Sequence, residues 1–134
     1  MQDFRWLSRN LVDAIHGDLL RQFGGAGGVR DSNLIESALA RPRQRLAYDP
    51  TSDFASLAAA YGFGLTKNHG YNDGNKRIGF MAMYVFLSLN GLELEALEEE
   101  VVEIMLDVAA GDLSEEELAA WLRDKLEPRS KSSV

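Results

Sequence analysis

Two stretches of the chain, residues 54–65 and 78–89, are apolar nearly throughout. Gly79 and Ser88 are the only interruptions in the second stretch. A helix that is apolar on all sides has no polar face to turn towards water, so it must lie inside a bundle. The second stretch is too short to cross a bilayer, which takes about 20 apolar residues. The two stretches therefore predict buried helices at the centre of a small all-α domain.

The other elements are predicted from apolar spacing and from residues that begin or end helices. Ser114 and Glu117 have the spacing of a capping box, the clearest helix start in the chain. Pro42 is expected to end the second helix, with an irregular or short helical link after it. Helices are expected over residues 11–23, 34–41, 54–65, 78–89, 98–110 and 114–126, with a brief extended piece or turn over 92–95. The prediction is a compact all-α bundle of about six helices, one domain over residues 1–127, with a disordered polar tail over 128–134.

Composition excludes several classes of protein. The 134 residues suffice for one hydrophobic core, and a hydrophobic content of 46% argues against a disordered chain. The chain has no cysteine, which excludes disulfides and thiol chemistry. A net charge of −7 without a large basic patch argues against direct nucleic-acid binding. Residues 1–6 lack the apolar run of a signal peptide, so the expectation is a cytoplasmic protein without a membrane partner.

The segment between the two apolar stretches, residues 69–77, reads His-Gly-Tyr-Asn-Asp-Gly-Asn-Lys-Arg. If the second buried helix begins near Gly74 and Asn75, its free N–H groups and the positive end of its dipole point outward there. Lys76 and Arg77 add full charges, which suits the site to phosphate. Alternatively, Gly74 and Asn75 only form a tight turn, and Lys76 and Arg77 are ordinary surface charges. Adjacent cations at a helix start, however, oppose the dipole unless an anion is bound.

His69 and Asp73 add reactive groups beside this phosphate site. His69 could take a proton from an attacking hydroxyl, or it could only cap the end of the preceding helix. Asp73 could hold Mg²⁺ through its carboxylate oxygens. Its alternative role is the N-cap of the buried helix, accepting a hydrogen bond from the backbone of Asn75 or Lys76.

Three further features receive no catalytic role. Residues 24–30 are rich in glycine but lack the Gly-Lys-(Ser/Thr) ending of a phosphate loop, so they are interpreted as a connector. His16 is expected to be packed or to face solvent. The cluster of Arg41, Arg43 and Arg45 is expected to be a solvated surface, with docking to an acidic partner as the alternative.

Residues 69–77 closely resemble the signature of the Fic/Doc superfamily, His-x-Phe-x-(Asp/Glu)-Gly-Asn followed by basic residues. The Asp-Gly-Asn-Lys-Arg form resembles the death-on-curing (Doc) branch, and the resemblance covers most of the chain from about residue 11 to 122. It implies that His69 is the general base and that Asp73 binds Mg²⁺. Tyr71 stands at the phenylalanine position and is expected to anchor the loop in the core. The residues implied to bind the phosphates of ATP are Gly74, Asn75, Lys76 and Arg77.

The resemblance also implies an activity. It suggests the toxin of a toxin–antitoxin pair, a kinase that phosphorylates a threonine hydroxyl of elongation factor Tu and arrests translation. Unlike AMP-transferring Fic enzymes, the chain has Lys76 in place of a second glycine and Phe80 in place of a second arginine. A separate Phd-like antitoxin is the expected partner, since the chain lacks the self-inhibitory helix pattern Ser/Thr-x-x-x-Glu-(Gly/Asn). The alternatives are AMP transfer to a protein hydroxyl, and a regulatory module that binds an antitoxin without catalysis.

Overall fold

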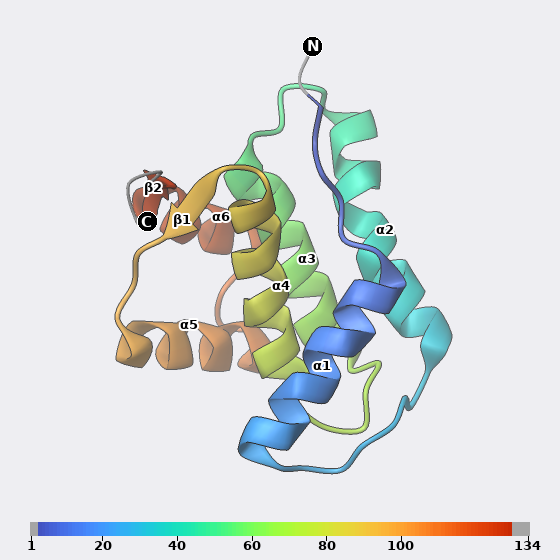
Figure 1. Cartoon of the computed structure of the whole chain (residues 1–134). Coiled ribbons are helices and arrows are strands. Elements are labelled where there is room, and N and C mark those ends of the chain that lie inside the picture. The colour runs from blue at the N-terminus through green and yellow to red at the C-terminus, as the bar shows by residue number, and fades with distance from the viewer. Residues whose placement is uncertain (1–2, 130–134) are drawn as a thin grey trace.

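The computed structural model describes residues 3–129. This part of the chain contains six α-helices and one two-stranded sheet, which confirms the predicted all-α bundle (Figure 1). The elements follow in the order α1 (Arg9–Phe23), α2 (Ser32–Tyr48), α3 (Phe54–Asn68), α4 (Asn75–Leu89), β1 (Leu92–Leu94), α5 (Glu98–Ala110), α6 (Glu115–Asp124) and β2 (Leu126–Pro128).

Helices α3 and α4 lie side by side at the centre of the bundle, as the two apolar stretches predict (Figure 1). Small residues let the neighbouring helices approach closely. A β-carbon on Gly62 would lie 2.6 Å from Met83 Cγ, and one on Gly64 would lie 2.7 Å from Arg41 Cδ on α2. The buried side chains of α4 are Asn75, Ile78, Ala82, Met83, Phe86 and Leu87. This packing fixes both ends of the segment that joins α3 to α4.

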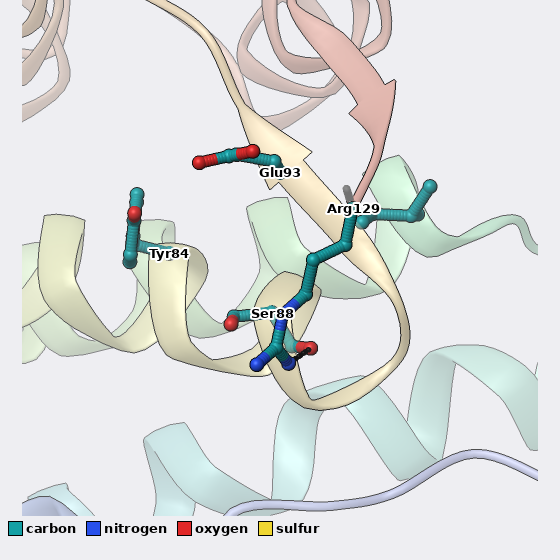
Figure 2. A pocket seen from close by; sticks show the side chains of 5 residues that line it. Tyr84, Ser88, Glu93 and Arg129 are labelled. Carbon is teal, nitrogen blue, oxygen red and sulfur yellow. Dashed lines mark hydrogen bonds between the residues drawn. The ribbon is translucent and has the colours of Figure 1, made fainter. Parts of the chain in front are cut away.

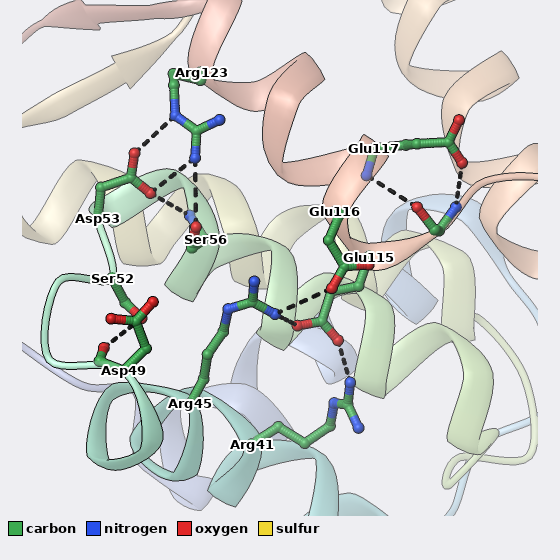
Figure 3. Close-up of polar contacts among 11 residues, drawn as sticks. Arg41, Arg45, Asp49, Ser52, Asp53, Ser56, Glu115, Glu116, Glu117 and Arg123 are labelled. Atoms are coloured by element: carbon green, nitrogen blue, oxygen red, sulfur yellow. Dashed lines mark hydrogen bonds and ion pairs between the residues drawn. The ribbon is translucent and has the colours of Figure 1, made fainter.

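Helix α2 continues through Pro42 to Tyr48, so the prediction that this proline ends the helix is wrong. A proline inside a helix removes one backbone hydrogen bond and strains the preceding turn. Pro42 is buried, and the turns around it are tied to α6, because Arg41 and Arg45 both pair with Glu115 (Figure 3). These tertiary contacts outweigh the local signal, and the predicted link is a continuation of α2.

The sheet closes the far end of the fold. The extended piece predicted near β1 is confirmed, and it pairs with β2 in antiparallel orientation, with Leu94 opposite Leu126. Strand β2 was not predicted, because Leu126 was assigned to the last helix, which in fact ends at Asp124. Pairing with β1 gives this backbone the hydrogen bonds that another helical turn would have supplied.

The predicted tail, residues 128–134, lies outside the described residues from 130 onward. Pro128 is the last residue of β2, and the backbone N–H of Arg129 donates a hydrogen bond of 2.9 Å to the carbonyl of Gly91. Between residues 3 and 129, no helix is both long enough and apolar enough to cross a membrane.

Candidate active site

The segment predicted to carry the chemistry links the end of α3 to the start of α4. Its backbone takes the left-handed conformation at His69 (φ 52°, ψ 48°) and again at Gly74 (φ 79°). Among residues 3–129, His69 is the one residue other than glycine with a positive φ. This conformation costs a residue with a β-carbon about 1–2 kcal/mol. Contacts from other parts of the chain must therefore hold His69 in place.

The imidazole of His69 is exposed, and its Nδ1 lies 3.2 Å from the carbonyl oxygen of Thr66. Because a carbonyl can only accept, Nδ1 carries the hydrogen in the neutral ring, and Nε2 keeps its lone pair. The alternative role of His69 as a cap of α3 is thus correct. It is also compatible with catalysis, since the cap selects the tautomer in which Nε2 can accept a proton.

Arg30 holds the strained residue from outside the loop. Its Nε donates to the carbonyl of His69 (2.7 Å) and its Nη2 to the carbonyl of Asn68 (3.2 Å). Its backbone N–H donates to the carbonyl of Gly70 (2.8 Å). Three consecutive carbonyls at the end of α3 are therefore satisfied by one residue, which the sequence alone did not single out.

Asp73 is exposed, and its carboxylate accepts two backbone hydrogen bonds. Oδ1 accepts from the N–H of Gly74 (2.8 Å), and Oδ2 accepts from the N–H of Ala26 (3.3 Å). The N-cap of α4 is Gly74, and no side chain among residues 3–129 caps this helix. The alternative role of Asp73 as the N-cap, bonded to Asn75 or Lys76, is therefore wrong.

These surroundings favour the ionised form of Asp73. The N–H groups of Gly74 and Ala26, and then the charges of Arg77 and Lys76, hold the pKa of Asp73 below its ordinary value. Hydrogen bonds to a carboxylate stabilise its charged form. Asp73 is therefore an anion at neutral pH, the form that can bind a cation.

Asn75 supports the loop and does not reach outward. Its side chain is 5% exposed and bonds to both backbone groups of Tyr71. The N–H of Tyr71 donates to Oδ1 of Asn75 (3.1 Å), and Nδ2 of Asn75 donates to the carbonyl of Tyr71 (3.0 Å). Phosphate binding by Asn75 stays a prediction, and only its backbone N–H is placed to take part.

Tyr71 is the predicted core anchor, and the prediction is confirmed. It is 2% exposed, and its hydroxyl donates a hydrogen bond of 2.6 Å to Asp13 on α1. Burial, and then this bond to a carboxylate, raise the pKa of Tyr71 above its ordinary value. Its ring also stacks on His16, which is buried. Of the two expectations for His16, packing is therefore the correct one.

Lys76 and Arg77 are both exposed in the first turn of α4. Within residues 3–129, neither cation has a carboxylate oxygen within the 4.0 Å of an ion pair. The guanidinium of Arg77 lies 4.6 Å from the centre of the Phe23 ring, a cation–π contact at the end of α1. With no side chain capping the helix, its first N–H groups and both cations are left for an anionic ligand.

The glycine-rich residues 24–30 are more than a connector, because they run along the outside of the predicted site. Val29 forms an antiparallel bridge with Tyr71. The backbone N–H of Asn72 donates to the carbonyl of Gly28 (3.1 Å), and its Nδ2 donates to that of Gly27 (3.0 Å). This strip and the α3–α4 segment lie side by side, and we call them the site rim (residues 24–30 and 69–77). Gly70, Tyr71 and Asn75 are its buried members.

Known proteins with similar sequences indicate the family of this chain. Residues 6–87 match the Fic/DOC family. A protein of Escherichia phage P1 named "Protein kinase doc" is 28% identical over 119 residues, which cover 89% of this chain and 94% of that protein. A protein of Mycolicibacterium smegmatis named "Toxin Doc" is 36% identical over 103 residues, covering 75% of this chain and 79% of that protein.

The chain belongs to the Doc branch of the Fic/DOC family. It is therefore a Doc-type toxin of the Fic/Doc transferase class. The matched residues contain the whole site rim.

The Fic/Doc resemblance implies Mg²⁺ at the site, and the residues present are compatible with this ion. Between residues 3 and 129, no three His, Cys, Asp or Glu side chains gather as a metal-binding group. Mg²⁺ is often held by one or two carboxylates together with substrate phosphates and water, and needs no cage of protein ligands. Asp73 fits this pattern, because it is ionised and exposed, and because the charges of Arg77 and Lys76 stabilise its carboxylate.

The site rim carries exposed functional side chains, and two hollows lie outside it. Figure 2 shows one of about 220 Å³ between the later turns of α4 and strand β1, lined by Tyr84, Ser88, Leu92, Glu93 and Arg129. On the site rim, by contrast, His69, Asp73, Lys76 and Arg77 are all exposed. A ligand there would be bound on one side by the chain and could meet a protein substrate on the other.

Proposed function

We propose that this chain is a Mg²⁺- and ATP-dependent protein kinase, the toxin of a toxin–antitoxin pair, whose target is a threonine hydroxyl of elongation factor Tu and whose activity arrests translation. The observation that carries the proposal is that Nε2 of His69 lies on the same rim as two cations, and that within residues 3–129 neither cation has a carboxylate partner. The names of the two relatives, a protein kinase and a toxin, support the same function.

The site rim has the parts that phosphoryl transfer needs. Lys76, Arg77 and the uncapped N–H groups of α4 would bind the phosphate oxygens of ATP and stabilise the charge that gathers on them. Asp73 would hold Mg²⁺, which neutralises phosphate charge when bound. Phe23 keeps the Arg77 guanidinium in place through its ring.

The transfer itself uses His69. Its Nε2 takes the proton of the acceptor hydroxyl, and the hydroxyl oxygen forms a bond to the γ-phosphorus of ATP. The bond between that phosphorus and the bridging oxygen breaks, and ADP leaves with the electron pair. The carbonyl of Thr66 stabilises the resulting imidazolium through Nδ1–H. A phosphorylated protein and ADP are the products.

Labelled ATP tests the reaction. Elongation factor Tu is incubated with the chain, Mg²⁺ and ATP labelled at either the α- or the γ-phosphate, with His69→Ala as the control. Transfer of γ-label to threonine, absent with His69→Ala, is the expected result. Transfer of α-label would replace the proposal with AMP transfer, and no label from either position on this target would refute the assigned substrate.

Expression in cells tests the toxin assignment against a role in binding alone. The wild-type chain should arrest growth, and His69→Ala should not. Equal growth arrest by both chains would favour a module that acts only by binding. Co-expression with a Phd-like antitoxin should restore growth and give a complex on size-exclusion chromatography, and failure to form one would count against a Phd-like partner.

A further inference from the structure

His16 lies directly beneath the site rim, on α1, and it is 4% exposed. Its Nε2 is 2.8 Å from the backbone carbonyl oxygen of Asp73, a residue 57 positions later in the chain. A carbonyl oxygen has no hydrogen to give, so Nε2 of His16 must be the protonated nitrogen of the neutral ring. The sequence motifs give His16 no role, and the proposed mechanism does not use it.

The orientation of the His16 ring is fixed by its neighbours. The ring stacks on Tyr71 with centroids 3.8 Å apart and planes 16° from parallel. Tyr71 is itself held by Asp13 through its hydroxyl and by Asn75 through its backbone. The imidazole therefore cannot swing away from the Asp73 carbonyl without breaking this stack.

The bond acts on the peptide unit that joins Asp73 to Gly74. His16 holds the oxygen of this unit, while the N–H of the same unit donates to the Asp73 carboxylate (2.8 Å). The direction of the peptide and the direction of the carboxylate are thus linked. Because glycine tolerates both signs of φ, the backbone before α4 has little resistance of its own to a turn of this peptide.

We infer that His16 is a positioning residue, which fixes the Asp73–Gly74 peptide and thereby aims the Asp73 carboxylate at the site where Mg²⁺ and the phosphates bind. The inference rests on the proposed function. Groups that orient a metal-binding carboxylate without touching the metal commonly change metal affinity by about 10–100-fold when removed. A residue needed only for packing would change stability and leave this affinity alone.

Two variants separate the hydrogen bond from the packing. His16→Phe keeps an aromatic ring against Tyr71 but has no donor for the Asp73 carbonyl. His16→Gln loses the ring, yet it can place an amide N–H near the position of Nε2. Their effects on thermal unfolding report on packing, and their effects on Mg²⁺ dependence report on the aim of Asp73.

The test measures binding of a non-hydrolysable ATP analogue by calorimetry across a range of Mg²⁺ concentrations. We expect His16→Phe to raise the half-saturating Mg²⁺ concentration about 10-fold or more, and His16→Gln to raise it less than about 3-fold. Binding without Mg²⁺ should be similar in all three chains. A folded His16→Phe chain with the wild-type Mg²⁺ dependence would overturn the inference.

Nitrogen NMR of the wild-type chain keeps the inference testable if His16→Phe fails to fold. His16 should carry its proton on Nε2, and this proton should exchange slowly with water. A proton on Nδ1 would overturn the inference. Failure of the proposed function is distinct: a wild-type chain that binds Mg²⁺ and nucleotide with the expected His16 dependence, but transfers no γ-phosphate, would refute the kinase and leave the positioning role intact.

Discussion

Charged side chains are used differently in two regions of the molecule. Between α2 and α6, Glu115 is 8% exposed and pairs with both Arg41 and Arg45, and Figure 3 shows the three side chains pointing towards one another. On the site rim, Lys76 and Arg77 are exposed and have no carboxylate partner within residues 3–129.

The difference separates charges that stabilise the fold from charges left available to a ligand. Glu115 neutralises two cations at once. Its removal would leave Arg41 without a carboxylate partner within residues 3–129, and Arg45 with only Glu116 at 3.9 Å. Lys76 and Arg77 have the opposite effect on the fold, because they face the positive end of the α4 dipole and destabilise the helix until an anion binds. Substitutions between α2 and α6 should therefore change the stability of the fold, and substitutions on the site rim should change the transfer of the γ-phosphate.

Replacing His69 should give the largest effect. His69→Ala removes the proton acceptor and should lower γ-phosphate transfer by about 10²–10⁴-fold, the usual contribution of a general base. His69→Asn is the matched control for backbone strain, because asparagine tolerates the left-handed conformation and has no basic nitrogen. Both chains should stay folded by circular dichroism. Wild-type transfer by His69→Asn would show that the rim is not organised around this base.

Replacing Glu115 should mainly change stability. Glu115→Ala should lower the free energy of unfolding by about 2–3 kcal/mol, somewhat less than for a fully buried pair because Arg41 is partly exposed. Urea unfolding measures this. Glu116→Ala is the control: Glu116 is 75% exposed and 3.9 Å from Arg45, so its loss should cost about 0.5 kcal/mol or less. If each folded Glu115→Ala molecule transferred less γ-phosphate than the wild type, Glu115 would not serve stability alone, and the prediction would be contradicted.

Replacing Lys76 or Arg77 should mainly lower γ-phosphate transfer and leave the stability of the fold nearly unchanged. Lys76→Ala or Arg77→Ala should each lower transfer by about 10–100-fold, since a hydrogen bond to a charged group contributes about 1.5–3 kcal/mol. The free energy of unfolding should stay constant or rise by up to about 0.5 kcal/mol as repulsion from the dipole is relieved. Arg21→Ala, an exposed cation on α1 paired with Asp18, should change neither quantity. Marked destabilisation by Arg77→Ala would place that cation among the fold-stabilising charges.

Replacing Asp53, which pairs with Arg123, should give the smallest effect. The effect is a loss in the free energy of unfolding that depends on pH. Hydrogen bonds from Arg123, and then from the backbone of Ser56, hold the pKa of Asp53 well below its ordinary value (Figure 3). A lowered carboxyl pKa stabilises the fold above the ordinary pKa of about 3.9, and the contribution is lost as pH falls through the lowered value.

Asp53→Asn isolates this contribution, because asparagine still caps α3 but carries no charge. At pH 7 the variant should be less stable by about 0.5–1 kcal/mol, the value of an exposed pair. The difference should shrink as the pH falls below about 4. Urea unfolding at pH 7, 5 and 3 measures it, and a difference that grows towards low pH would contradict the assignment.

Much of the fold could be predicted because its signals are local. The stretches that form α3 and α4 are apolar nearly all round, and caps such as Ser114 act within three residues of the helix start. The prediction that Pro42 ends α2 was wrong because the contacts that stabilise the helix there are distant in sequence. Arg41 and its partner Glu115 are 74 positions apart. Strand β2 was missed for the same reason, since its partner β1 lies far back in the sequence.

The candidate site divides in the same way. His69, Asp73, Lys76 and Arg77 stood out because they are close in sequence and chemically distinct. Arg30 could not be identified, because it lies 39 positions from the His69 carbonyl that it holds. The N-cap role of Asp73 was a sound local interpretation, but the distant Ala26 and the adjacent Gly74 supply the carboxylate with other partners.

The left-handed backbone at His69 places folding and catalysis in opposition at a single residue. Glycine adopts this conformation without strain, so His69→Gly would remove the base and relieve about 1–2 kcal/mol of backbone strain. Pressure to fold would by itself favour glycine here. The strained histidine at this turn is therefore accounted for by the proton transfer proposed for its side chain and not by the preference of the backbone.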